Sequence, residues 1–229
     1  CCMEDPSFHW NLPTQNPDGT WSPGEWMPAI EGELRPCYNG YHLAENAHVL
    51  EFLGPRILEP EHRGAVVGTE NKIVVRECRL LREFTGWNER IARLFAVWCA
   101  REALKLVSQP DPSSAVACDV AERFANGETT AKELAAAFAP AWAAASDAEW
   151  PGVSDPMRYA TRAAAYASAW FDDAFNSARA AAWAAARDVT WRGDWAPEGD
   201  PARALARDVV RAAQYRQFCV MIGIEGVTA

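Results

Sequence analysis

Alanine is distributed very unevenly along this 229-residue chain, and its distribution constrains the fold more than any other feature. Residues 1–86 contain four alanines, whereas residues 87–229 contain thirty-nine. Because alanine has the highest helix propensity of all residues, the second stretch is expected to be helical. The change in composition predicts two modules joined near Thr85 and Gly86: an α+β module over 1–86, and an all-α, alanine-rich helical bundle over 87–229.

Residues 1–86 are dense in turn signals. Pro-Asp-Gly at 17–19 and Ser-Pro-Gly at 22–24 are typical of tight turns, and Asn-Gly at 39–40 is typical of a hairpin turn. A short helix is predicted for 44–53, and strands are predicted for 56–61 and 72–83. In the second strand, apolar residues of both parities indicate a central or covered position. The first module is therefore expected to be a small sheet with one short helix.

Residues 87–229 show helical periodicity almost throughout. Thr130 and Glu133 match the capping-box pattern, and an Asp-Pro pair at 155–156 and again at 200–201 places a capping residue before a first-turn proline. Five helices are predicted, over 87–107, 113–125, 130–149, 156–189 and 201–222. Between the alanines we expect large aromatic residues such as Trp142 and Trp170 to fill the gaps between helices.

Trp183 is expected to differ from these packed tryptophans. It shares a helix face with Arg179 and Arg187, and exposed Trp beside Arg is typical of the residues that dominate protein interfaces. These three residues are therefore candidate binding residues. Trp21 and Trp26 of the first module are further candidates, although inward packing across the turns is favoured over an exposed aromatic patch.

The charge of the chain narrows the classes of partner. With 22 basic and 31 acidic residues the formal net charge is −9, and such a field repels phosphate, so neither nucleic acid nor an anionic membrane is an expected partner. There is no apolar run of 18 residues that could span a bilayer, and no basic-then-apolar leader. The seven cysteines are odd in number and scattered, which predicts a reduced, cytoplasmic protein with buried thiols. The chain opens with Cys1, so residues upstream are expected to be missing.

Common catalytic motifs do not occur in the sequence: GxGxxG, GxxxxGK[ST], HExxH and GxSxG are all missing. No cofactor is predicted, and an enzyme is the less favoured class. One alternative is that the stretch from Cys37 onward resembles the nicotinamide pocket of ADP-ribosyltransferases. Tyr41, His42 and Glu77 would then be the catalytic candidates. A weaker alternative is a metal site at Cys37 and His42, although no CxxC pair accompanies them.

Several short segments of the chain stand out together. They are Trp10–Thr14, Gly19–Trp26, Leu34–Leu43, Trp87–Arg90 followed by Leu94–Ala96 and Cys99–Ala100, and Ala121–Glu128. These segments resemble a group of uncharacterised proteins of actinobacteria and their phages. In these proteins an Ala/Trp/Arg-rich helical tail follows, which is similar to the helical domain of proteins named as immunity proteins from their genomic association with toxins. In related sequences a strand is expected before the equivalent of Cys1.

The missing catalytic motifs, the acidic charge and the Trp-rich helical module predict a non-enzymatic protein-interaction module with a protein as its partner. The resemblance adds a phage or actinobacterial origin and an immunity-like or anti-host role. Two alternatives stay open. One is an NAD-using enzyme similar to ADP-ribosyltransferases, and the other is a structural or assembly component of a phage particle.

Overall fold

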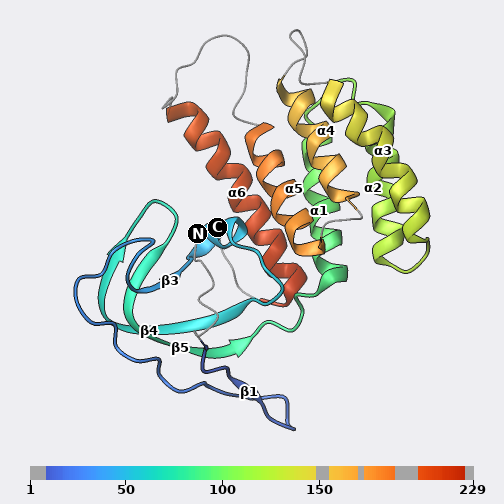
Figure 1. Ribbon diagram of the computed structural model, residues 1–229. Coiled ribbons are helices and arrows are strands. Elements are labelled where there is room, and N and C mark those ends of the chain that lie inside the picture. Colours follow the sequence, from blue (N-terminus) through green and yellow to red (C-terminus); the bar gives the residue numbers. More distant parts are fainter. Residues whose placement is uncertain (1–8, 148–154, 170–172, 189–200, 225–229) are drawn as a thin grey trace. The chain divides into compact units, whose positions relative to one another are not determined.

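A computed structural model describes residues 9–147, 155–169, 173–188 and 201–224 (Figure 1). Internal contacts divide the chain into two compact units, Cys1–Phe52 with Arg56–Thr85, and Leu53–Pro55 with Gly86–Ala229. The first unit holds short strands and a small antiparallel sheet, and the second is built from α-helices. The fold class expected from the sequence, an α+β module followed by a helical bundle, is confirmed.

The described part of the first unit contains two sheets. Strands β1 and β2 form an antiparallel pair, and strands β3, β4 and β5 form a three-stranded antiparallel sheet in the order β3-β5-β4. A short 3₁₀-helix, η1, follows β3, where the sequence predicts a short helix. The bounds are β1 Thr14–Gln15, β2 Trp21–Ser22, β3 Tyr41–Leu43, η1 Asn46–Glu51, β4 Leu58–Gly68 and β5 Ile73–Glu83.

Strand β5 is the centre of the larger sheet, as the two-sided apolar pattern predicts. Val74 and Val75 are both fully buried. One edge of β5 pairs with β4. Its other edge is shared, because β3 occupies Ile73–Val75 and the backbone N–H groups of residues 24, 27 and 30 donate to the carbonyls of residues 80, 78 and 76. Glycine is required at Gly24, since a Cβ there would lie 2.0 Å from the backbone oxygen of Asn11.

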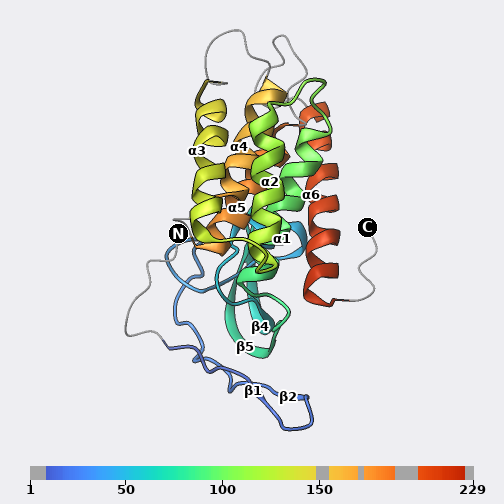
Figure 2. The ribbon, with the colours of Figure 1, turned by 90° about the vertical axis from the view of Figure 1, so that its right-hand side faces the viewer.

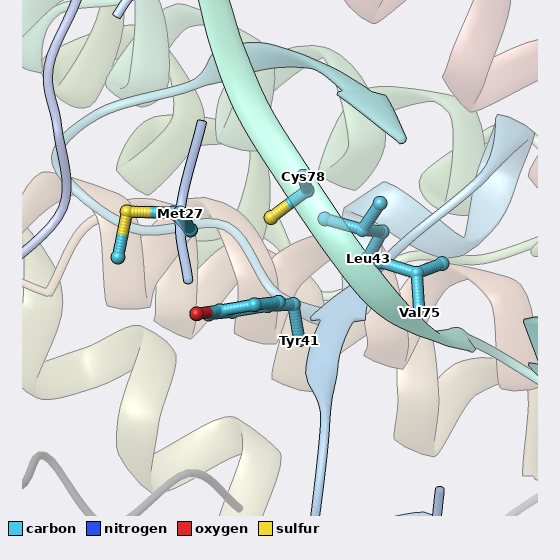
Figure 3. Packing of buried hydrophobic residues seen from close by; sticks show 5 residues of the cluster. All are labelled: Met27, Tyr41, Leu43, Val75 and Cys78. Atoms are coloured by element: carbon cyan, nitrogen blue, oxygen red, sulfur yellow. The ribbon is translucent and has the colours of Figure 1, made fainter. Parts of the chain in front are cut away.

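The core of this sheet gathers around β5. Met27, Leu43, Val75 and Cys78 pack with Tyr41 in one buried cluster (Figure 3). The Tyr41 hydroxyl donates a hydrogen bond to the carbonyl of Pro28 at 2.8 Å, so its polar atom is satisfied within the core. Burial raises the pKa of the Tyr41 hydroxyl above its ordinary value. The strand β3 is thus anchored by Tyr41 and Leu43, which alternate with the less buried His42.

Among the described residues, the outer edge of β4 has no strand partner, and its sequence protects it. The carbonyls of residues 78 and 80 in β5 point away from β4. Residues directly opposite each other in such a pair then both point their backbone polar groups away from the partner strand, so those of His62 and Pro60 point to the free edge of β4. Proline has no N–H to offer there. The ladder is then interrupted by a register shift after Arg63, where Gly64 adopts a φ of +83°. Proline and a bulge are typical devices against edge-to-edge pairing.

The second unit contains six helices in its described part. Pairwise packing arranges them in two layers, α2-α1-α6 and α3-α4-α5, which Figure 2 shows nearly edge-on. Alanine allows this close packing: α5 alone buries seven alanines. The bounds are α1 Glu89–Leu104, α2 Pro112–Ala125, α3 Ala131–Asp147, α4 Asp155–Ala167, α5 Ala174–Asp188 and α6 Pro201–Ile222.

The helix starts follow from local sequence. Thr130 and Glu133 form the predicted capping box: the Thr130 N–H donates to the Glu133 carboxylate at 2.9 Å, and the Glu133 N–H donates to the Thr130 hydroxyl at 3.3 Å. Asn88 caps α1, and Asp111 caps α2 just before its first-turn proline.

The single helix predicted over 156–189 is two helices, α4 and α5. At the end of α4 the Ser168 hydroxyl donates to the carbonyl of Ala164 at 3.1 Å, and Arg93 donates to the carbonyl of Ala169 at 3.2 Å. Asp173 then accepts a hydrogen bond from the Asn176 N–H at 2.7 Å and caps α5. The apolar periodicity continues across this junction, so the sequence pattern concealed the capping signal of Asp173.

An aromatic cluster joins α1, α5 and α6 within the helical unit. The Trp87 ring lies 5.2 Å from Phe218 and 5.8 Å from Phe175, and the Phe95 ring lies 5.8 Å from Phe218, between ring centroids. The indole N–H of Trp87 donates to the carbonyl of Gly54 at 2.7 Å, so this buried tryptophan has its polar atom paired.

Candidate functional site

The outer side of the α3-α4-α5 layer carries a concentration of aromatic and arginine side chains that we call the aromatic face. Trp142 on α3 and Trp183 on α5 are each 44% exposed. Helix α4 lies between these helices and contributes half-buried tyrosine and arginine side chains. The aromatic face consists of Phe138, Trp142, Tyr159, Arg162, Tyr166, Arg179 and Trp183.

Trp183 is displayed because α5 buries alanine on its other sides. Ala178, Ala182 and Ala185 are almost completely buried, whereas Arg179 and Trp183, four residues apart, are exposed. Arg179 donates a hydrogen bond to the side-chain oxygen of Asn176 at 2.7 Å. The predicted exposure of Trp183 next to Arg179 is what the structure shows.

Trp142 was expected to pack between helices, and this expectation is wrong. The buried stripe of α3 is formed by Leu134 and by small alanines such as Ala141, which leaves the neighbouring Trp142 at the rim. Its ring stacks on Phe138 with centroids 5.6 Å apart and meets the edge of Tyr166 at 6.3 Å. One side of the indole is thus supported while the rest stays exposed. The other tryptophan of this prediction, Trp170, lies outside the described residues.

Arg187 belongs to α5, but its side chain lies outside the described part of the structure. Of the three predicted binding residues on this helix, the structure therefore describes the side chains of Trp183 and Arg179 only.

Trp26 in the first unit is half-buried between two arginines. The guanidinium carbons of Arg63 and Arg79 lie 4.1 and 5.0 Å from the centre of its ring. Both arginines are in turn paired with glutamates on the neighbouring strand, so Trp26 belongs to a packed polar cluster of the sheet. Trp21 in β2 is also half-buried. Trp26 is thus half-buried among partly exposed charged side chains, and it is not part of the buried cluster around Tyr41.

Charged pairs line one face of the β4–β5 ladder. Glu59, Glu61 and Arg63 of β4 lie directly opposite Arg82, Arg79 and Glu77 of β5, and each opposed pair forms an ion pair. These pairs are partly exposed, so each contributes only about 0–1 kcal/mol to stability. Their main effect is on register, because a shift of two residues, which keeps the same face, would place Glu61 opposite Glu77 or Arg63 opposite Arg79.

The three candidate residues for an ADP-ribosyltransferase-like site lie in three different environments. The Tyr41 hydroxyl is bonded to a backbone carbonyl in the core. His42, the next residue on β3, points to the other face of the sheet. The Glu77 carboxylate accepts hydrogen bonds from Nε and Nη2 of Arg63 at 2.9 and 2.6 Å. The structure does not bring these side chains together on one face.

Cys37 and His42, the alternative metal pair, do lie close together, but through the backbone. The Cys37 N–H donates to Nε2 of His42 at 2.7 Å, while the Cys37 thiol contacts the ammonium group of Lys72 at 3.0 Å. Within the described ranges, no group of three or more His, Cys, Asp or Glu side chains could hold a metal ion.

The Asn39-Gly40 pair does not form the central residues of a hairpin turn, contrary to what the sequence predicted. The turn spans residues 35–39 instead, and Cys37 within it has a φ of +66°.

Comparisons with known proteins place no constraint on this site. No family model matches the chain, and neither the curated proteins nor the solved structures contain a match. In the described part of the chain, none of the helices has the length and apolar character needed to cross a membrane.

Proposed function

We propose that this protein is a non-enzymatic protein-interaction module that binds a protein partner through the aromatic face of its helical unit. The observation that carries the proposal is the exposure of two tryptophans, Trp142 on α3 and Trp183 on α5, the two helices that flank α4 in one layer. Contiguous exposed apolar patches rimmed by polar residues typically mark interaction sites on a folded domain.

The composition of the aromatic face fits a protein partner. Tryptophan, tyrosine and arginine are the residues most enriched among those that dominate interface energies. Tryptophan and tyrosine also bury a large area for few rotatable bonds, so their ordering on binding costs little entropy. Trp142 is already braced by Phe138 and Tyr166, which reduces that cost further.

The charge of the chain supports a basic partner. The net charge of −9 attracts a basic surface at long range and steers its association. Such a partner would suit an immunity-like or anti-host role, in which an acidic protein covers the basic surface of a toxin or nuclease. That role, and an origin in actinobacteria or their phages, rest on the resemblance described above.

The cysteines support a reducing compartment, as a cytoplasmic protein requires. Cys78, Cys99, Cys118 and Cys219 are free thiols buried in the two units. Buried unpaired cysteines are typical of intracellular proteins, where disulfides are rare.

The test is an affinity capture from a host lysate with matched variants. The tagged chain, Trp183→Ala and Trp142→Ala are compared with Val116→Ala, which removes an apolar side chain that is 53% exposed on α2 of the other layer. We expect one stoichiometric protein to be retained by the parent chain and by Val116→Ala, and to be lost from both tryptophan variants. Circular dichroism checks that all four chains are equally helical.

Salt dependence tests the basic charge of the partner, whereas the tryptophan variants test the aromatic face as the binding surface. If a basic partner is steered by charge, the association rate falls as ionic strength rises, while the dissociation rate changes little. Retention of every captured protein by both tryptophan variants would overturn the assignment of the aromatic face as the binding surface.

A further inference from the structure

Cys37 and Lys72 bring two reactive side chains into contact from segments far apart in the sequence. The Sγ atom of Cys37 and the Nζ atom of Lys72 are 3.0 Å apart. Cys37 is exposed, whereas the other four cysteines in the described residues are buried. The pair is therefore accessible to small oxidants from solvent, and no other described thiol is.

Both partners of this contact are fixed by their own backbone. The turn that presents Cys37 is closed by hydrogen bonds to the carbonyl of Arg35, and the Cys37 N–H donates to Nε2 of His42. On the other side, the Lys72 carbonyl accepts from both the N–H and the hydroxyl of Thr69, at 2.8 and 2.9 Å. The backbone segments that carry the thiol and the amine are thus each fixed by a separate turn.

Lys72 also prepares the sulfur for reaction. A positive charge next to a thiol favours the thiolate, which is the form that reacts with peroxides. The hydrogen bond from Lys72 holds the pKa of Cys37 below its ordinary value. Burial, in contrast, raises the pKa of Cys78 to about 12, so that thiol stays protonated. His42 is not the base for Cys37, because its Nε2 accepts from the backbone.

We infer that Cys37 and Lys72 form a peroxide-responsive covalent crosslink. In the first step the Cys37 thiolate attacks hydrogen peroxide: an S–O bond forms, the O–O bond breaks, and the released hydroxide takes a proton from the Lys72 ammonium group, which leaves one water and the neutral amine. In the second step the neutral amine of Lys72 attacks the sulfenic sulfur: an S–N bond forms and the S–O bond breaks. The departing hydroxide takes a proton from nitrogen and leaves as water. One thiol, one amine and one hydrogen peroxide thus give one sulfenamide and two waters.

The second step competes well because of geometry. A sulfenic acid condenses with a nitrogen that is held against it, as known for backbone nitrogens. Here the amine is already in contact with the sulfur, so capture is intramolecular and benefits from a high effective concentration. The product covalently links the turn at 35–39, which precedes β3 in the sequence, to Lys72, which directly precedes β5. A thiol reductant reverses it by attack on the S–N bond, which makes the crosslink a redox-sensitive clamp of the first unit.

The test is peroxide treatment of the full chain followed by peptide mapping. Cys1 and Cys2 are first replaced by serine so that they offer no competing thiols. We expect a peptide pair joined through Cys37 and Lys72, with a mass lower by two hydrogens than the sum of the two reduced peptides. Dithiothreitol should restore the separate peptides, and the oxidised chain should melt at a higher temperature because a crosslink restricts the unfolded state.

Two variants distinguish the steps. Lys72→Arg keeps the positive charge but replaces the amine with a poorly nucleophilic guanidinium, so Cys37 should still be oxidised and its sulfenic acid should be trapped by dimedone without a crosslink. Cys37→Ser should give neither product. The inference is overturned if the parent chain yields only sulfinic acid at Cys37, or if the parent and Lys72→Arg give the same products.

Discussion

Replacing Phe218 by alanine should strongly destabilise the helical unit. Phe218 is 2% exposed and packs against Trp87 and Phe95, with ring centroids 5.2 and 5.8 Å away. Loss of a buried phenylalanine side chain costs about 1.5–3 kcal/mol in transfer free energy, and the cavity left behind raises this to about 3–5 kcal/mol. For a chain of this size each kcal/mol lowers the melting temperature by about 2–4 °C, so we expect a decrease of about 6–20 °C.

The assay is thermal and urea unfolding followed by far-UV circular dichroism, which reports mainly on the helices. Val220→Ala is the matched control, because Val220 lies on the same helix two residues away and is 70% exposed. Its effect should stay within about 0.5 kcal/mol. An equal effect of the two substitutions would refute the packing of α6 through Phe218.

A double-mutant cycle with Phe95 tests the contact itself. The two rings meet edge to face, at an interplanar angle of 68°. Such pairs contribute about 0.5–1.5 kcal/mol beyond the area they bury. Phe95→Ala combined with Phe218→Ala should therefore cost less than the sum of the single substitutions by at least that amount. Strict additivity would show that the rings are not in contact.

Three further predictions follow from single contacts. Gly24→Ala should destabilise the first unit by about 1–3 kcal/mol in urea unfolding, because its Cβ would lie 2.0 Å from a backbone oxygen; an unchanged midpoint would contradict that approach. Alkylation of Cys37 by iodoacetamide should reach half its maximal rate below the pH of about 8.5 typical of a free thiol, and Lys72→Gln should move this midpoint upward, since the Lys72 contact lowers the pKa of Cys37; equal midpoints would contradict this. The Glu133 carboxylate accepts hydrogen bonds at the start of α3, which lowers its pKa from 4.5 to about 2. Its stabilising contribution is thus complete above pH 4.5 and lost as the pH falls toward 2, so Glu133→Gln should lose less stability than the parent over this interval in acid melting curves.

Much of the fold could be predicted because its determinants are local. The capping box of Thr130 and Glu133 fixes the start of α3 within a few residues of sequence. The central position of β5 is visible in the adjacent apolar pair Val74 and Val75, because only a strand covered on both faces buries both parities. The strand β4 was predicted too short, ending at 61, because its distal part is exposed and carries a glycine bulge.

The candidate site was predicted only in part. Trp183 was recognised because its polar neighbours Arg179 and Arg187 follow helical spacing. Trp142 was missed, since it lies on the same four-residue spacing as the buried Leu134 and periodicity alone does not separate the centre of a stripe from its rim. The contact of Lys72 with Cys37 spans 35 residues and leaves no trace in local sequence.

Alanine content, capping residues and apolar parity determined, from the sequence alone, that this chain has an α+β part followed by a helical bundle. These signals are local in sequence, so they can be recognised without knowledge of the tertiary contacts between helices and strands. Tertiary structure decided which tryptophans stay exposed, which thiol meets an amine, and where a continuous apolar stripe breaks into α4 and α5. The exposure of the tryptophans and the contact of the thiol with the amine depend on which distant segments pack together, because both partners of a contact must be known. The break between α4 and α5 combines the local cap of Asp173 with the distant hydrogen bond from Arg93.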